Sequence, residues 1–328
     1  MTPERLDHFR TELQSRRHRL LRRISDGRAA SDLTDLLRDV DAALDRLDQA
    51  SFGKCDVCHK EVEGSDLDAH PLLTWCLCEM SDQQALWLQR DLNLATRIQR
   101  SLLPAPDMRF EQWWIDYRYL PLGPVSGDYC DAMTCSADGE SLYFLLGDVS
   151  GKGVAASLTM ARLSALFRSL IASGPTVSEL VTRANELIPQ GSGNTQYVTM
   201  IVGRAARNGE VSIANAGHVR PVLVQPNGAK TIEPGGKPLG LFPDPGVPAV
   251  SLKMQPGDTL FLCTDGLIEA ANAEGEPYGE QRLVSLVHAH HRAAPSALID
   301  AVLQDQARLR NGHAHTDDVS ILVLRAMD

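Results

Sequence analysis

The sequence predicts an α+β protein with more than one folded unit. Strand-like runs come in consecutive groups and helical stretches come in pairs, which favours α+β over regularly alternating βαβ units. Apolar residues make up 43% and charged residues 23% of the chain, close to the averages of globular proteins and unlike those of a disordered chain. The chain has 328 residues, about twice the length of a typical domain, so we expect two domains.

The first 49 residues predict a helical hairpin. Apolar residues recur at helical spacing from Leu6 to Ile24 and from Leu33 to Leu47, and Asp26-Gly27 interrupts the pattern. A short break between two helices is typical of an antiparallel pair. Five arginines precede the break, and they form either a solvated helical face or a partner-binding tip: Arg16, Arg17, Arg19, Arg22 and Arg23.

A cysteine cluster follows the hairpin. Cys55 and Cys58 form a C-x-x-C pair, and Cys76 and Cys78 form a second pair after 17 intervening residues, a spacing that suits one tetrahedral Zn²⁺. With Phe52-Gly53 before it, this segment resembles the zinc finger of the DksA/TraR family, which also follows a helical hairpin. That family closes its zinc site with C-x-x-C, whereas the second cysteine pair here has one residue fewer between its cysteines. His59 or His70 could therefore replace one thiolate ligand. The alternative interpretation of the segment is a cluster of reduced thiols without zinc.

Residues 81–103 predict a linker helix without Gly or Pro, which Pro104 ends. Its narrow apolar stripe either pairs with a second copy of the chain in a homodimer or packs on the domain that follows: Leu88, Leu92, Ala95, Ile98 and Leu102. We therefore divide the chain into a hairpin with zinc finger (residues 1–80), a linker helix (81–106) and a C-terminal domain (107–328).

The C-terminal domain alternates strand-like and helical stretches. The expected strands are 113–120, 141–148, 197–205, 210–217, 258–265 and 319–325. The expected helices are 154–172, 177–187, 279–291 and 296–310.

Acidic residues recur where apolar strands end. VSGDYCD (125–131), YFLLGDVSGKG (143–153) and LFLCTDGLIEA (261–271) each combine Gly with Asp, and Asp317-Asp318 precedes the last strand. Carboxylates that converge repel one another and lose favourable hydration, and a bound cation offsets both costs. Oxygen ligands of this kind suit Mg²⁺ or Mn²⁺. Any one such Asp is more often a turn or capping residue, and spacing alone does not prove that the four places meet.

These motifs resemble those of the SpoIIE-type serine/threonine phosphatases, the bacterial branch of the metal-dependent protein phosphatase (PPM) superfamily. The resemblance covers about residues 94–328 and rests on six motifs in the family's order: VSGDYCD, GDVSGKGVAASL, NAGHVRPVLV, GGKPLGL, TDGLIEA and HTDDVSILVLR. It implies an α-β-β-α sandwich, in which two antiparallel sheets lie face to face between helix pairs, with two Mn²⁺ or Mg²⁺ ions at one end.

The resemblance also implies the roles of individual residues. Asp148 would bridge the two ions, and the backbone carbonyl of Val149 would add a ligand to one of them. Asp265 and Asp317 would hold the other ion, with Asp317 preferred to its neighbour Asp318. Asp128 would contact the site directly or through water, and Asp131 is a weaker outer candidate.

The implied reaction is attack of a metal-activated water on phosphoserine or phosphothreonine, with no phospho-enzyme intermediate. Lys152 either supplies positive charge near the phosphate or is an exposed loop lysine. His218 in NAGH is expected to be structural. Cys130, Cys135 and Cys263 are expected to pack as small apolar residues.

Charge and patterning narrow the choice of partners. A formal net charge of −10 opposes broad binding to nucleic acid, and the charged N-terminus lacks the apolar core of a signal peptide. No apolar run approaches the roughly 18 residues that span a membrane. We therefore expect a cytoplasmic homodimer. By resemblance, its substrate is a phosphorylated anti-anti-sigma factor of the STAS type, and the alternative function is RNA polymerase binding through the N-terminal hairpin.

Overall fold

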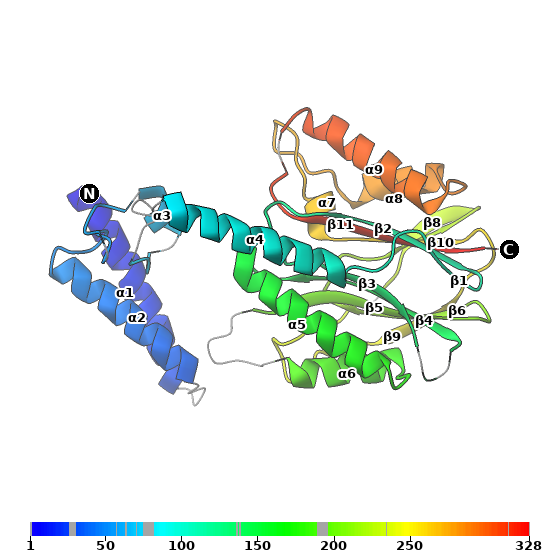
Figure 1. The fold of residues 1–328 in the computed structure, drawn as a ribbon, viewed down its shortest axis with the longest axis horizontal. Helices are drawn as coiled ribbons and strands as arrows, with labels where there is room; N and C mark the ends of the chain where they lie inside the picture. The colour runs from blue at the N-terminus through cyan, green and yellow to red at the C-terminus, as the bar shows by residue number, and fades with distance from the viewer. Residues whose placement is uncertain are drawn as a thin grey trace. The chain divides into compact units, whose positions relative to one another are not determined.

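The structure is a computed structural model that describes residues 2–25, 31–56, 58–62, 64–69, 71–74, 82–135, 137, 139–188, 196–233, 235–313 and 315–327. It divides into two compact units, one from Met1 to Arg90 and the other covering Asp91–Gln190 and Gln196–Asp328. Each unit has its own hydrophobic core. Figure 1 traces the chain through both of them.

The N-terminal unit contains α1 (Pro3–Ser25), α2 (Ser31–Asp48) and the short α3 (Gly64–Ala69). Arg10 pairs with Asp48 at 2.5 Å and Arg17 with Asp41 at 2.6 Å, so the two long helices run antiparallel. Phe9 and Phe52 meet in the core beneath them, with ring centroids 5.3 Å apart. The predicted hairpin is therefore present, and Arg17 of the arginine cluster helps to hold it together.

The linker helix is α4 (Asp82–Leu102). Gln99 is buried and Leu92 and Leu102 are partly buried, whereas Leu88 and Ile98 are 44% and 54% exposed. The C-terminal half of the helix packs on the domain that follows, through Leu102 and Gln99, as the second alternative expects. The first alternative, pairing with a second copy of the chain, stays a prediction.

The second unit is built on two antiparallel sheets. One has the strand order β1-β2-β11-β10-β7-β8, from Met108–Phe110, Trp113–Leu120, Val319–Ala326, Thr259–Cys263, Val222–Gln225 and Gly228–Thr231. The other has the order β3-β4-β5-β6-β9, from Tyr129–Thr134, Ser141–Val149, Val198–Ala206, Glu210–Ala216 and Ala249–Lys253.

Helices cover both outer faces, as Figure 1 shows. The five-stranded sheet packs against α5 (Gly153–Ile171) and α6 (Val177–Leu187), and the six-stranded sheet against α8 (Glu280–Ala289) and α9 (Pro295–Arg310). A four-residue helix, α7 (Asp265–Ile268), follows β10. The expected α-β-β-α sandwich is thus confirmed.

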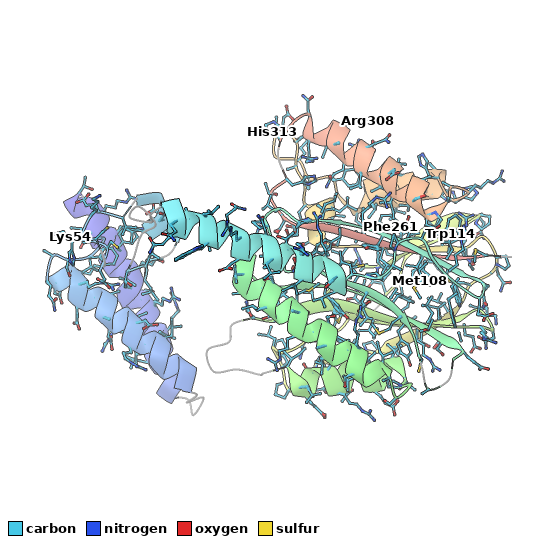
Figure 2. The ribbon with its side chains drawn as sticks, viewed as in Figure 1. Lys54, Met108, Trp114, Phe261, Arg308 and His313 are labelled. Atoms are coloured by element: carbon cyan, nitrogen blue, oxygen red, sulfur yellow. The ribbon has the colours of Figure 1, made fainter. Side chains whose placement is uncertain are left out.

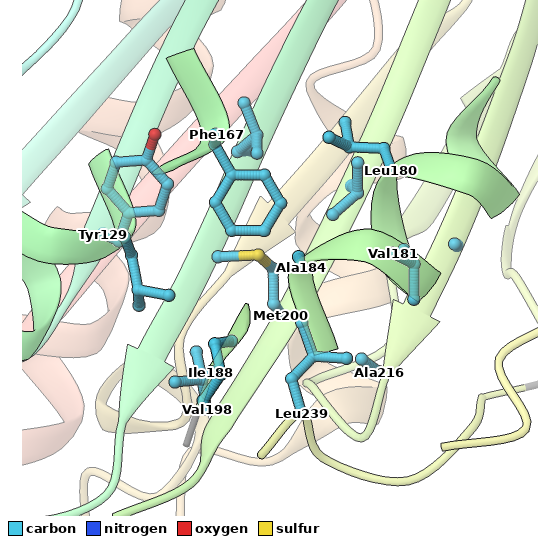
Figure 3. Close-up of a cluster of buried hydrophobic side chains, with 14 of the residues drawn as sticks. Tyr129, Phe167, Leu180, Val181, Ala184, Ile188, Val198, Met200, Ala216 and Leu239 are labelled. Carbon is cyan, nitrogen blue, oxygen red and sulfur yellow. The ribbon is translucent and has the colours of Figure 1, made fainter. Parts of the chain in front are cut away.

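The strand period of two produces three apolar layers. In β4, Phe144 and Leu146 face the layer between the sheets, while Tyr143 and Leu145 face α5 and α6. Figure 3 shows this outer layer, where Phe167 lies among Leu180, Met200 and other buried side chains. A third layer of the same kind lies beneath α8 and α9.

Among the described helices, only α5 is long and apolar enough to cross a membrane. The sequence pattern did not predict a membrane span there. Its buried face, including Met160, Leu163 and Phe167, packs in the layer of Figure 3. This packing identifies α5 as a core helix of the sandwich.

Candidate active site

Acidic residues from both sheets gather at one end of the sandwich. Asp148 stands near the end of β4, opposite Thr199 of β5. Asp265 begins α7 immediately after β10, and Asp317 precedes β11. Asp128 is buried just ahead of β3. We call Asp128, Asp148, Asp265 and Asp317 the carboxylate cluster.

Burial and mutual repulsion dominate the electrostatics of the carboxylate cluster. The pKa of Asp148 is raised to about 7, first by burial and then by the negative charges of Asp265 and Asp317. Burial and the charge of Asp317 also raise the pKa of Asp265. Burial raises the pKa of Asp128 well above its ordinary value, and Asp148 adds to this effect. These carboxylates therefore lie close enough to repel one another, although they come from distant parts of the chain.

Lys152 provides positive charge at the cluster. Its Nζ lies 2.8 Å from Asp317 Oδ2 and donates to the backbone oxygen of Thr316 at 2.9 Å. Its charge lowers the pKa values of Asp148 and Asp265, but these pKa values stay raised. One ammonium therefore neutralises the cluster only in part. The side chain is 57% exposed, so it remains open to solvent while bound to Asp317.

Asp318 has a different role from its neighbour Asp317. Its Oδ2 accepts from Ser126 Oγ at 2.7 Å and from the backbone N–H of Gly127 at 3.2 Å, and its Oδ1 accepts from the backbone N–H of Leu122 at 2.6 Å. Both oxygens thus anchor the loop of residues 122–127. This geometry favours Asp317 over Asp318 as a cation ligand.

Ser126 connects this loop to the carboxylate cluster. Its Oγ donates to Asp318 and accepts from the backbone N–H of Asp128 at 3.0 Å. From the other sheet, Thr264 Oγ1 donates to Asp128 Oδ2 at 3.1 Å and accepts from the backbone N–H of Ser320 at 2.9 Å. Two hydroxyl groups therefore fix the backbone and the side chain of Asp128.

Gln99 of α4 holds Ser126 from behind. Its Nε2 donates to the backbone oxygen of Ser126 at 2.7 Å, and its Oε1 accepts from the backbone N–H of Ser126 at 3.0 Å. The side chain of Thr96, one turn earlier, donates to the backbone oxygen of Pro124 at 2.6 Å. The sequence analysis missed Gln99, Thr96, Ser126 and Thr264. Gln99 could have been found from its polar side chain, which stands at helical spacing within the apolar stripe of α4.

Two glycines of the predicted motifs allow the chain segments to approach. A Cβ on Gly127 would lie 3.0 Å from the backbone oxygen of Val149 and 3.5 Å from Asp148 Oδ1. A Cβ on Gly266 would lie 2.0 Å from the backbone oxygen of Asp318. Glycine is therefore required wherever the loop and α7 close around the cluster.

Asp131 does not join the cluster, and its expected outer role is wrong. It is fully buried within β3, where Arg168 Nε lies 2.9 Å from its Oδ2 and the hydroxyl of Tyr129 donates to the same oxygen at 3.1 Å. Burial raises the pKa of Asp131, and the hydrogen bond from Arg168 opposes this rise. Arg168 also donates to the backbone oxygen of Leu102, so the network ties α5 to α4.

The other residues named in the sequence analysis either have structural roles or lie outside the described part of the chain. His218 is buried, with Nδ1 2.9 Å from Thr199 Oγ1 and its backbone N–H bonded to Asn215 Oδ1, as a structural histidine. Cys130, Cys135 and Cys263 are buried free thiols. Cys55 is buried and Cys58 is partly buried beside it, whereas Cys76, Cys78, His70 and Asp26 lie outside the described residues.

The donor set of the carboxylate cluster fits a hard divalent cation. It offers carboxylate oxygens and the nearby carbonyl of Val149, it lacks thiolate and imidazole, and an ammonium group already lies on Asp317. Within the described part of the chain, no three His, Cys, Asp or Glu side chains stand close enough together to form a ready-made metal site.

Known proteins are similar to this chain in sequence and in fold. Protein IcfG of Synechocystis is 27% identical over 267 residues, and the match covers 71% of this chain but only 41% of that protein. Phosphoserine phosphatase RsbU of Bacillus subtilis is 24% identical, covering 73% of this chain and 70% of that protein. The structure of the SiaA-PP2C domain of Pseudomonas aeruginosa superposes with a TM-score of 0.62 at 19% identity, covering 74% of this chain and 98% of that domain.

The sandwich gives this unit the fold of the SiaA-PP2C domain. The chain belongs to the SpoIIE family (Stage II sporulation protein E), whose model matches residues 138–327, more than half of its length.

Proposed function

We propose that this chain hydrolyses phosphoserine or phosphothreonine on a regulatory protein and that it uses two Mn²⁺ or Mg²⁺ ions. The observation that carries the proposal is the gathering of Asp148, Asp265 and Asp317 from both sheets, where the pKa values of Asp148 and Asp265 are raised and one ammonium group lies on Asp317. Keeping such charges together costs folding free energy, which a divalent cation would offset.

The resemblance to the SpoIIE-type phosphatases implies which residues would be ligands: Asp148, the carbonyl of Val149, Asp265 and Asp317 would hold the two ions. Asp128 is fixed by Ser126 and Thr264, so it would orient water or an ion from a constant position. Asp318 would keep the 122–127 loop in place.

When bound, the ions neutralise charge on the phosphoryl oxygens and increase the acidity of water. Lys152 is exposed beside Asp317, and its ammonium would bind a phosphoryl or leaving-group oxygen. The hydrogen bond to Asp317 raises the pKa of Lys152, so it stays charged at neutral pH. No cysteine nucleophile is needed, and Cys130 and Cys263 are buried among apolar side chains where burial raises the pKa of each thiol.

Metal-dependent hydrolysis of a phosphoserine protein tests this proposal. Asp265→Asn and Asp317→Asn should each abolish Mn²⁺-dependent turnover, whereas Asp300→Asn, in an exposed pair with Arg118, should leave it within about twofold of the wild type. Retained turnover in the first two variants would refute the ligand assignment.

We further propose that residues 1–80 carry one structural Zn²⁺ bound by Cys55, Cys58, Cys76 and Cys78. Support comes from the tight turn at the first pair, in which the His59 N–H donates to the Cys55 oxygen at 2.9 Å and His59 takes φ of 57°. One equivalent of zinc in the purified full chain, lost in Cys55→Ser, is the expected result. A metal-free wild-type chain would refute the zinc finger.

We propose a cytoplasmic homodimer that acts on a STAS-type anti-anti-sigma factor. The dimer is supported by the exposed apolar residues Leu94 and Ile98 of α4. The substrate class is supported by the likeness to RsbU. Dephosphorylation of such a factor in vitro is the direct test. RNA polymerase that copurifies only when residues 1–80 are present would favour the alternative function instead.

A further inference from the structure

A cavity of about 480 Å³ is lined in part by His315, which lies two residues before Asp317 of the carboxylate cluster. One wall is apolar and comes from the end of β2 and the turn after it, and the other is basic and comes from the end of α9 and the loop after it. We call it the α9 pocket, and its principal lining residues are Leu120, Pro121, Leu122, Arg310, His313 and His315. Figure 2 labels His313 just beyond the end of α9.

The basic wall holds donors and acceptors that have no partner. Arg310 Nε and His315 Nδ1 are both shielded from solvent, and neither forms a hydrogen bond within the described part of the chain. Arg310 Nη1 donates to the backbone oxygen of His313, which fixes the guanidinium at the pocket. None of the lining residues is acidic. A buried donor without an acceptor is costly, so the arrangement favours an incoming anion.

The chain segments that line the α9 pocket also carry residues of the candidate active site. His315 precedes Asp317 by two residues, and Lys152 binds the oxygen of Thr316 between them. On the opposite wall, the backbone N–H of Leu122 donates to Asp318. A group bound in the pocket would therefore lie beside a phosphoryl group held at the carboxylate cluster.

The mixed character of the pocket selects the kind of anion. Leu120 and Leu122 are 38% and 49% exposed, so half of the lining offers apolar contact. A free phosphate ion would gain nothing from that wall. An aspartate or glutamate side chain would place its methylene groups there and its carboxylate on Arg310, as a charge-assisted hydrogen bond.

We propose that the α9 pocket binds an acidic side chain of the phosphoprotein, close in its sequence to the phosphorylated residue, and that Arg310 and His315 determine this specificity. The inference rests on the proposed phosphatase function and adds a recognition element to it. Neither residue contacts the reacting atoms, so both act on substrate choice and leave the chemical step to the carboxylate cluster.

The test compares phosphopeptides that carry Glu or Gln, scanned one position at a time on both sides of phosphoserine. With the wild-type full chain and Mn²⁺, Glu at one of these positions should raise kcat/KM about tenfold. Arg310→Gln should remove the preference and keep hydrolysis of p-nitrophenyl phosphate within about twofold. Arg308→Gln, labelled on α9 in Figure 2 and exposed, is the matched control and should keep the preference.

A second variant guards against a loss of structure. Arg310→Glu should reverse the selectivity and favour a peptide with Lys at the same position, which a misfolded protein cannot do. A wild-type enzyme that hydrolyses both peptides equally, or a preference that survives Arg310→Gln, overturns the inference while the phosphatase function stands. Failure of the wild type on every peptide and on p-nitrophenyl phosphate would instead refute the phosphatase function.

Discussion

The sandwich contains two acidic sites that are held in opposite ways. At Asp131, a guanidinium, a phenol and a backbone N–H satisfy the carboxylate, so the charge has its counterpart within the protein. At the cluster of Asp148, Asp265 and Asp317, carboxylates face one another with a single ammonium beside them. The comparison teaches that an acidic residue is informative only together with its neighbours. The charge of the first site is balanced within the fold, whereas the second site has the unbalanced charge that the proposed cations would offset.

Among the comparisons of the two acidic sites, removing the Asp148 carboxylate should have the largest effect. We expect Asp148→Asn to lower Mn²⁺-dependent phosphatase activity on the order of 10³-fold, as the loss of a preorganised electrostatic group does. Because the variant also loses one repelling charge, the metal-free protein should unfold at an equal or higher temperature. Calorimetry with and without Mn²⁺ and a turnover assay measure both effects. Activity within tenfold of the wild type would erase the distinction between the two sites.

His218 offers a buried titratable group without any counter-charge. Burial lowers its pKa to about 4, against an ordinary value of 6.5. The folded state therefore holds a neutral imidazole while the unfolded chain gains a proton, and stability falls as the pH drops from about 6.5 to 4. The full loss is about 3 kcal/mol.

Urea unfolding at a series of pH values measures this loss, with His218→Gln as the reference that lacks the titrating group. The gap between the two proteins should change steadily across that interval. A constant gap would mean that His218 binds protons equally in both states.

Breaking the satisfied acidic site should destabilise the fold and spare the chemistry. Asp131→Ala leaves Arg168 without its carboxylate partner. Because the Arg168 side chain is 47% exposed, we expect the free energy of unfolding to fall by about 2 kcal/mol, less than for a fully buried pair. Specific activity of the folded fraction should stay within about twofold. Chemical denaturation and active-site titration report the two quantities separately. A selective loss of activity would show that Asp131 serves the site after all.

The smallest effect is expected at Gln99, which reaches the cluster only through Ser126. Gln99→Leu removes both hydrogen bonds to the Ser126 backbone, so we expect the Mn²⁺ concentration for half-maximal activity to rise about tenfold. Arg100→Ala, exposed on the same helix, is the control. An unchanged Mn²⁺ requirement in Gln99→Leu would show that α4 holds the loop without influencing the ions.

Local patterns predicted most of the sandwich, because its strands are apolar and its helices have clear ends. The predicted strand 113–120 matches β2, and the predicted helix 177–187 matches α6. The prediction did not include β3, whose sequence YCDAMT carries a charge in its middle. That charge is tolerated only because Arg168 reaches it from α5, a contact that no local pattern contains.

The candidate site likewise contains residues that the sequence predicts and residues that only the fold shows. Its acidic residues stand in recognisable motifs at strand ends, so their gathering could be anticipated from the sequence. The groups that hold them, Gln99, Ser126 and Thr264, make hydrogen bonds to residues 27, 192 and 136 positions away in the chain. The opposite roles of Asp317 and Asp318 depend likewise on which backbone N–H groups face each one, and that follows only from the fold.

The acidic end of the sandwich spans its two layers, with Asp148 contributed by the five-stranded sheet and Asp265 and Asp317 by the six-stranded one. Any ion shared among them is therefore also a crosslink between layers that are otherwise joined there by apolar packing and a few hydroxyl groups. We therefore expect loss of that ion to remove one connection between the layers at this end, while the apolar layer between the sheets stays packed.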